Sequence, residues 1–258
     1  MTDVLETEQD SSDHPHDGGA RRAIRIFGWT TIGFGLFLLG FVGHQLFVTT
    51  YFAQQANEGL TEEVTSRFAD VEISEVPYLD PTIGSTEPTN STDPSDPFVD
   101  PEVRYPTLLV EAPPDVGEPF AIITIPSIPR LAGGWAVVEG VSRKTLRAGA
   151  GHMPSTPLPG QPGNSVISGH RTTYGAPFHE LDMLKPGDLI EVETALGVHT
   201  YRVTGSEIVS PRDLWVTEDR GGATLTLTTC HPKFSSRQRL VVFAELIDGP
   251  NAPAILGT

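Results

Sequence analysis

The sequence contains one cysteine, Cys230, and the residues around it give that thiol a possible chemistry. It ends the segment TLTLTTC (224–230), in which Leu225 and Leu227 alternate with threonines. Alternate side chains of a β-strand share a face, so Cys230 leaves the strand on the threonine side, away from the leucines. One cysteine cannot form an internal disulfide or a paired-cysteine zinc site. The thiol is therefore an inert buried group, an intermolecular partner or a nucleophile.

A second residue with possible chemistry is Arg239, which begins the hydrophobic segment RLVVFA (239–244). If 231–238 form the loop of an antiparallel hairpin, Cys230 and Arg239 face each other with Cα atoms about 4.5–5.5 Å apart. A guanidinium favours the thiolate, and it can bind the oxygen on which negative charge develops during acyl transfer. A surface arginine beside a buried cysteine is the alternative, and these residues alone leave both interpretations open.

His170 is a third candidate, because it ends the strand-like segment NSVISGH (164–170) and precedes the loop RTTYGAPF. An imidazole at a strand end can exchange a proton with a thiol across a cleft. Reference pKa values of about 6.5 for His and about 8.5 for Cys make the thiolate–imidazolium pair a species of roughly 1%. A nearby Arg239 would increase that fraction. The other histidines of this region are expected to have structural roles: His152 and His179 in loops, His199 in a strand, and His231 pointing away from Cys230.

Short alternating or β-branched segments separated by Pro and Gly predict the elements that position these residues. The segments are 120–125, 135–139, 165–168, 189–194, 199–209, 224–229 and 240–246. Six to eight strands at this spacing favour a closed barrel or a sandwich. Only short helical stretches are expected, at 142–148 and 178–184. Residues 101–118 are expected to form a lead-in strand, with a lid over the cleft as the alternative.

The N-terminal part predicts a membrane anchor. Residues 26–48 form a 23-residue run without Lys, Arg, Asp or Glu, and as a helix it would extend about 34 Å, enough for a hydrocarbon core of about 30 Å. A signal peptide is the alternative, but its apolar region is usually only about 7–15 residues long. Arginines in the tail 1–25 precede the run, so the positive-inside rule predicts a cytoplasmic N-terminus and an exported C-terminal part.

Charge separates a linker from a folded domain. The net charge of −16 comes mainly from residues 1–19 and 58–102, whereas 103–258 hold 15 acidic and 13 basic side chains. The acidic segment 49–102, which is Pro-rich after a short helix expected at 58–68, is expected to be an extracytoplasmic linker, and 103–258 the catalytic domain. Nucleic acid is excluded as a partner, because no basic surface is expected.

Together these motifs resemble the sortase family, over about residues 118–247. The matching residues are TLTTC at 226–230, SGH at 168–170 and RLVVFA at 239–244. The phrase GHRTTYGAPF, together with CHP, resembles the class E branch of high-GC Gram-positive bacteria. The resemblance implies an all-β fold, a closed eight-stranded sortase-type barrel with short helices.

The resemblance also implies the activity and the site. Cys230, His170 and Arg239 would be catalytic, and the RLVVFA match favours Arg239 over Arg237, which shares its strand parity. Tyr174 and Thr229 are predicted to bind substrate, and no metal or cofactor is expected. The implied partners are secreted proteins with a C-terminal LAxTG- or LPxTG-like sorting signal and the amine of a peptidoglycan precursor. The signal would be cleaved between Thr and Gly at the cell membrane.

Other functions use similar residues. An L,D-transpeptidase also pairs His with Cys, but Thr229 stands where its HGC-type signature has Gly. A hydrolytic cysteine peptidase would use the same residues and differ only in the acceptor. An inactive barrel that binds wall components needs none of the three. A metal site at His170, Cys230 and His231 is disfavoured, because no carboxylate or second cysteine has suitable spacing.

Overall fold

The computed structural model describes residues 18–44, 49–78 and 106–257, and the chain divides into two compact units, 1–48 and 49–258. The first unit contains α1 (Gly18–Gly43). Its stretch Arg21–Gly43, with a mean hydropathy of 1.8, is long and apolar enough to cross a membrane. Residues 45–48 of the predicted span, and 1–17 of the predicted tail, lie outside the described residues.

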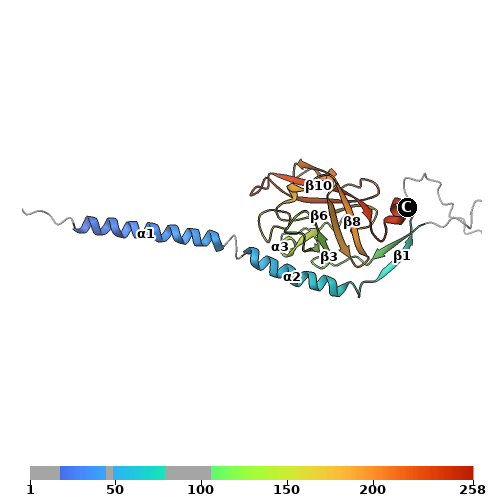
Figure 1. Cartoon of the computed structure of the whole chain (residues 1–258), viewed down its shortest axis with the longest axis horizontal. Coiled ribbons are helices and arrows are strands. Elements are labelled where there is room, and N and C mark those ends of the chain that lie inside the picture. The colour runs from blue at the N-terminus through green and yellow to red at the C-terminus, as the bar shows by residue number, and fades with distance from the viewer. Residues whose placement is uncertain (1–17, 45–48, 79–105, 258) are drawn as a thin grey trace, which may run out of the picture. The chain divides into compact units, whose positions relative to one another are not determined.

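The described part of the second unit contains strands, helices and 3₁₀ turns (Figure 1). In chain order they are α2 (Thr49–Arg67), β1 (Ile73–Pro77), β2 (Thr107–Glu111), β3 (Pro119–Thr124), β4 (Trp135–Glu139), α3 (Thr145–Ala148), β5 (Ala150–His152), β6 (Gly163–Ser168), the 3₁₀ turn η2 (Leu181–Met183), β7 (Leu189–Thr194), β8 (Gly197–Val209), the 3₁₀ turn η3 (Leu214–Thr217), β9 (Ala223–His231), β10 (Gln238–Asp248) and α4 (Ala252–Leu256).

Eight strands close into a barrel in the order β10-β8-β7-β3-β4-β5-β6-β9, which confirms the predicted fold. The pairs β4–β5 and β6–β9 are parallel, and the others are antiparallel. Alternation decides which side chains face the core: Leu225 and Leu227 of β9 pack there with Leu240 and Val242 of β10. The remaining described strands, β1 and β2, form a separate two-stranded antiparallel sheet.

Two strands have no counterpart in the predicted set, whereas β2 lies in the expected lead-in segment 101–118. All five residues of β1 are exposed, so it has no alternation to detect. The second, β5, has only three residues, centred on Gly151. A Cβ at this position would collide with the carbonyl oxygen of Gly140, so only glycine fits. Backbone proximity, rather than a side-chain pattern, produces this strand.

Part of the segment predicted to be a linker, 49–102, is folded against the barrel. The helix α2 runs along the outside of β3 and β4 (Figure 1). The buried side chain of Asn57 accepts a hydrogen bond from Ala136 N (2.9 Å) and donates one to Gly134 O (3.3 Å). These hydrogen bonds hold the helix on the barrel, a role that a broad apolar face usually has. Because the helix relies on them instead, its polar sequence suggested a linker. Residues 79–102 lie outside the described residues.

At one end of the barrel, two buried titratable groups meet on either side of Thr194. Burial raises the pKa of Glu111 to about 7, against the opposing effect of hydrogen bonds from Thr194 and from the N–H of Ala195. Burial lowers the pKa of His199 to about 4. One ring nitrogen of His199 lies 3.2 Å from the Thr194 hydroxyl. Both groups are therefore largely uncharged between these two pKa values.

Replacing Glu111 by Gln should make the protein relatively more stable as pH rises. The folded-state pKa of about 7 exceeds the ordinary 4.5, so the proton's contribution to stability is full below pH 4.5 and lost as pH rises through 7. Glutamine does not titrate. The difference in free energy of unfolding between variant and parent should shift by about 3 kcal/mol in the variant's favour over this range.

Urea unfolding of the full chain in detergent, followed by circular dichroism, measures this difference. His199→Gln is the matched control with the opposite sign, because the pKa of His199 is lowered to about 4. In the parent protein, His199 contributes stability that is present above pH 6.5 and lost as pH falls through 4. A pH-independent difference for Glu111→Gln would contradict the raised pKa.

Candidate active site

Cys230 lies near the end of β9, between strands that contain or precede the other two candidates. The antiparallel register of β9 and β10 pairs Cys230 with Arg239, as the hairpin argument predicted. On its other side β9 runs parallel to β6, with Ser168 beside Thr228. Cys230 is partly exposed. The thiol therefore lies near the end of a strand that has β6 on one side and β10 on the other.

His170 follows β6 at the same end of the barrel. The N–H of Gly169 donates to Thr228 O (3.0 Å), and the Thr229 hydroxyl donates to Gly169 O (2.7 Å), so the chain stays beside β9 after the strand ends. The β6–β9 register, continued from Ser168 and Thr228 by two residues, sets position 170 level with Cys230. Neighbouring strands lie about 4.8 Å apart. The three predicted catalytic residues thus come from three adjacent chain segments.

Strand alternation gives Cys230 and Arg239 a common face. Leu240 and Val242 belong to the barrel core, whereas Val241 and Phe243 pack in a smaller cluster with residues of β8 and η3. Arg239 has the parity of this second set. Cys230 has the opposite parity to the inward-facing Leu225 and Leu227 of its strand. Both side chains therefore leave the barrel on its outer face, and both residues are partly exposed.

The guanidinium of Arg239 is held by its own loop. Its Nη1 donates to Ser236 O and to Gln238 O, both at 3.0 Å. Within 18–44, 49–78 and 106–257, no carboxylate forms an ion pair with it. Its positive charge is therefore not neutralised by a described acid, and an oxygen with developing negative charge would find a positioned cation.

His170 lies in a partly buried environment that favours the neutral imidazole. Burial lowers its pKa, and the positive charge of Arg147 lowers it further. The ring packs on Tyr174 with centroids 5.0 Å apart, and Arg147 lies 5.2 Å from the centroid of the same tyrosine. Its Nε2 is buried and has no hydrogen-bond partner among the residues described. A neutral ring with an unpaired nitrogen can accept a proton.

The loop after His170 has an unusual backbone. Tyr174, Gly175 and Ala176 have φ values of 52°, 74° and 46°, in the left-handed region that non-glycine residues rarely adopt. A Cβ on Gly175 would lie 2.7 Å from the Trp135 ring, so this position needs glycine for space as well. Arg130 donates to Gly175 O (2.9 Å). The surrounding contacts maintain this conformation, which holds Tyr174 against His170.

Arg171 is a site residue that the motif analysis missed. Its side chain is buried, and its guanidinium donates to Cys230 O (3.3 Å) and His231 Nδ1 (3.0 Å) and pairs with Asp182 (3.0 Å). His179 Nδ1 in turn donates to Arg171 O (2.7 Å). This one residue therefore ties the chain after His170 to the end of β9. The only sequence signal was its position directly after His170.

The remaining predicted residues have defined places. Tyr174 is 44% exposed beside His170, so it is accessible to a ligand. Thr229 is buried, and its hydroxyl is engaged by Gly169 O. His152, expected in a loop, lies instead in β5 and is paired with buried Glu139 at 2.7 Å. His199 lies in β8, as predicted.

Comparisons with known proteins agree on one family. The model of the Sortase domain matches residues 124–247. Sortase SrtE1 of Streptomyces coelicolor is 32% identical over 148 residues, which cover 51% of this chain and 41% of that protein. The structure of the SrtF sortase from Corynebacterium diphtheriae has a TM-score of 0.51 and 30% identity, over 54% of this chain and 89% of that one. That of sortase E from Streptomyces avermitilis has a TM-score of 0.47 and 36% identity, over 52% and 91%.

The chain spans 41% of SrtE1 and 58% each of SrtE2 and Sortase D, so the likeness concerns the barrel rather than these whole proteins. Within the barrel, the matching region contains all three predicted catalytic positions. The chain therefore belongs to the sortase family, whose members are cysteine transpeptidases.

Proposed function

We propose that this protein is a membrane-anchored sortase that cleaves a C-terminal sorting signal and transfers the new acyl group to an amine of a peptidoglycan precursor. The observation that supports the proposal is the register around Cys230, which pairs Arg239 with Cys230 and pairs Ser168, two residues before His170, with Thr228. A nucleophile, a proton acceptor and a fixed cation on adjacent chain ends are the groups that acyl transfer needs.

In the proposed reaction, the thiol of Cys230 gives its proton to His170 and the sulfur attacks the carbonyl carbon of the signal's threonine. Arg239 binds the oxyanion that forms. Collapse of this intermediate breaks the Thr–Gly bond, and His170 protonates the departing glycine amine. The acceptor amine then attacks the thioester and loses a proton to His170, and Cys230 leaves as the thiolate. The lowered pKa of His170 provides the neutral imidazole with which this sequence begins.

The substrate is proposed to carry an LAxTG- or LPxTG-like signal. Tyr174 is partly exposed and packs against His170, so we assign it to the wall of the peptide groove. Thr229 is retained as a second groove residue, and its buried hydroxyl suits it to support the groove floor. Neither assignment needs a metal or a cofactor.

The proposed location is the outer face of the cell membrane. The apolar stretch Arg21–Gly43 would be the anchor. Arg21, Arg22 and Arg25 precede its most apolar part, so the N-terminus would be cytoplasmic and the barrel exported. An enzyme held there would meet both secreted proteins and membrane-bound wall precursors.

A peptide transfer assay tests the function. Full-length protein in detergent is incubated with a labelled LAxTG peptide, with and without a glycine-based amine, and products are resolved by mass spectrometry. A sortase gives a ligated product and a transient thioester on Cys230. Hydrolysis that added amine does not divert would instead assign a peptidase, and absence of any adduct would reject both.

Arg171→Lys should lower kcat by about tenfold, and Arg171→Met by about a hundredfold, with a smaller effect on KM. Methionine keeps apolar length but loses the bonds to Cys230 O and His231, whereas lysine keeps a charge that can reach fewer acceptors. Misplacement of the reacting groups lowers the rate of the bound complex more than substrate affinity.

A pH profile separates positioning from a general loss of structure. The rate of Cys230 alkylation by iodoacetamide should change its pH dependence in Arg171→Met and recover partly in Arg171→Lys. Arg143→Ala, at an exposed position, is the control and should match the parent. A folded Arg171→Met with parental kcat and alkylation profile would remove Arg171 from this role.

A further inference from the structure

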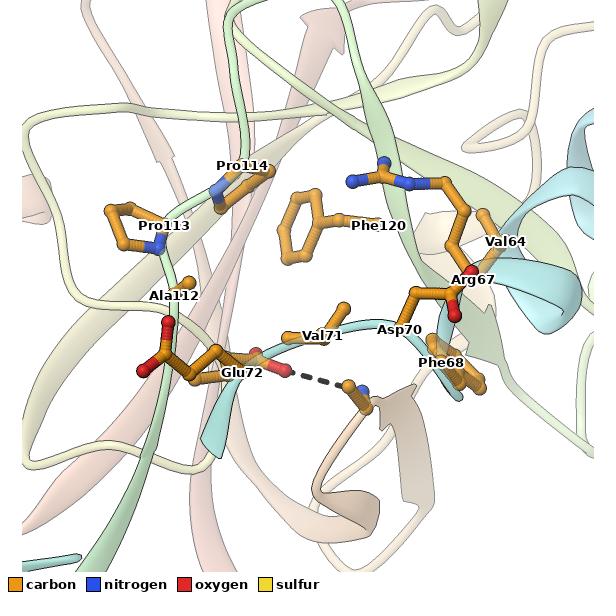
Figure 2. A pocket seen from close by; sticks show the side chains of 12 residues that line it. Val64, Arg67, Phe68, Asp70, Val71, Glu72, Ala112, Pro113, Pro114 and Phe120 are labelled. Carbon is orange, nitrogen blue, oxygen red and sulfur yellow. Dashed lines mark hydrogen bonds between the residues drawn. The ribbon is translucent and has the colours of Figure 1, made fainter. Parts of the chain in front are cut away.

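A cavity of about 280 Å³ lies where the end of α2 meets the β1–β2 sheet (Figure 2). Its walls are largely apolar, and they include Val64, Phe68, Val71, Pro113, Pro114 and Phe120. Figure 2 shows the prolines on one side, the α2 residues on the other and Phe120 between them. Four side chains with charged or titratable heads, Arg67, Asp70, Glu72 and Glu111, complete the lining.

This cavity is separate from the proposed active site. Ala195, which also lines it, lies just before the first residue of β8. The other end of β8, at Val209, pairs with Arg239 of β10. A strand of 13 residues extends for about 40 Å at roughly 3.3 Å per residue. A molecule in the cavity is therefore at the far end of the barrel from Cys230.

The buried carboxyl group of Glu111 is the chemical feature of the cavity. Glu111 is only 5% exposed. Its Oε2 accepts a hydrogen bond from Ala195 N (3.2 Å). Its Oε1 is buried and has no hydrogen-bond partner in the part of the chain that the structure describes. Buried polar atoms nearly always have a partner, so this oxygen is suited to a donor that enters the cavity.

The charges around Glu111 favour a cationic donor. Asp70 and Glu72 are exposed carboxylates at the cavity. Arg67 is the one cation among the lining residues, and its guanidinium is already bound to Glu118 (2.7 Å) and to Pro119 O (2.9 Å). The lining therefore has more negative than positive charge, and its one cation, Arg67, already pairs with Glu118. An ammonium group would donate a hydrogen bond to Oε1 and would also balance the excess negative charge of the lining.

We propose that this cavity binds a small primary amine with an apolar body, its ammonium group on Glu111 Oε1 and its apolar part against Phe120 and Val71. The volume of about 280 Å³ equals roughly nine water molecules at about 30 Å³ each, so the ligand is a compact one. The site is a second amine site, distinct from that of the acceptor that attacks the thioester. Its occupancy does not depend on Cys230.

Benzylamine is the probe, and benzyl alcohol is its neutral counterpart of the same shape. Titration of the full-length protein in detergent at about pH 8, by calorimetry and ligand-detected NMR without any peptide, should show saturable binding of benzylamine, because Glu111, with a pKa of about 7, is then mostly ionised. Benzyl alcohol and the Glu111→Gln variant should each give at least a tenfold weaker affinity, because a charge-assisted hydrogen bond is lost. Glu72→Gln, at the exposed carboxylate, should change affinity less than about threefold.

Two further variants make the outcome decisive. Ala112→Trp places an indole at the mouth of the cavity and should abolish binding while Glu111 remains. Cys230→Ala should bind benzylamine like the parent, so a failure of the proposed transpeptidation leaves this result unaffected. No saturable binding, equal affinity for the alcohol, or parental affinity in folded Glu111→Gln would each overturn the proposal.

Discussion

Replacing Cys230 by Ala should abolish transpeptidation, with a loss in kcat of about 10⁴-fold or more. In the proposed reaction the sulfur forms the covalent bond of the thioacyl intermediate, and alanine has no atom that can replace it. Mass spectrometry should show the acyl adduct on the parent and none on the variant. His170→Gln should lose about 10³-fold or more, because glutamine fills similar space without exchanging a proton.

The two variants differ in a way that tests their roles separately. His170→Gln keeps the thiol, so iodoacetamide should still label Cys230, although with an altered pH dependence. Cys230→Ala should still bind the sorting-signal peptide, since the groove is unchanged. If His170→Gln turned over the peptide within about threefold of the parent, the proton transfer would have to be assigned to another group. Near-UV circular dichroism of each variant verifies the fold.

Arg239→Ala should lower kcat by about 10²- to 10³-fold, which corresponds to about 3–4 kcal/mol of transition-state stabilisation. The guanidinium is anchored by Ser236 O and Gln238 O, so it is positioned before charge develops on the substrate oxygen. An oriented donor of this kind stabilises the oxyanion more than the ground-state carbonyl. Single-turnover kinetics of acylation would measure the loss directly.

Arg237→Ala is the matched control, because the two arginines share strand parity but differ in register. Arg239 pairs with Cys230, whereas Arg237 precedes β10 and is exposed. Its removal should change kcat less than about threefold. Arg239→Lys should recover only part of the activity, since an ammonium cannot reproduce the planar fork of the guanidinium. A larger loss in Arg237→Ala than in Arg239→Ala would reverse the assignment.

The strands with strong local patterns were predicted well. Those at 135–139 and 189–194 match β4 and β7 at both ends, because each segment has β-branched residues and clear Gly or Pro boundaries. By contrast β5 has almost no side-chain pattern, and it exists because Gly151 lets two backbones approach. The helix α2 was only partly expected, because one buried amide, Asn57, holds it on the barrel. An apolar stripe would be detectable in the sequence, whereas a single amide is not.

For the site, sequence motifs predicted the catalytic residues but not the residues that support them in the structure. Cys230, His170 and Arg239 carry reactive groups in recognisable segments. Arg171 looks like an ordinary charged residue until its burial and its bonds to Cys230 O and Asp182 are known. Glu111 likewise reads as the polar end of a short strand, and only its surroundings raise its pKa to about 7.

The sequence by itself determined the apolar N-terminal run, the alternation that makes a barrel, and the identity of the three chemical groups. These depend on the order of neighbouring residues, which a linear pattern records. Only the tertiary structure decided that β6 and β9, sixty residues apart, run parallel and pair Ser168 with Thr228, so that the segments containing His170 and Cys230 end side by side. It alone also buried Arg171 and Glu111, because burial and pairing depend on segments that meet when the barrel closes.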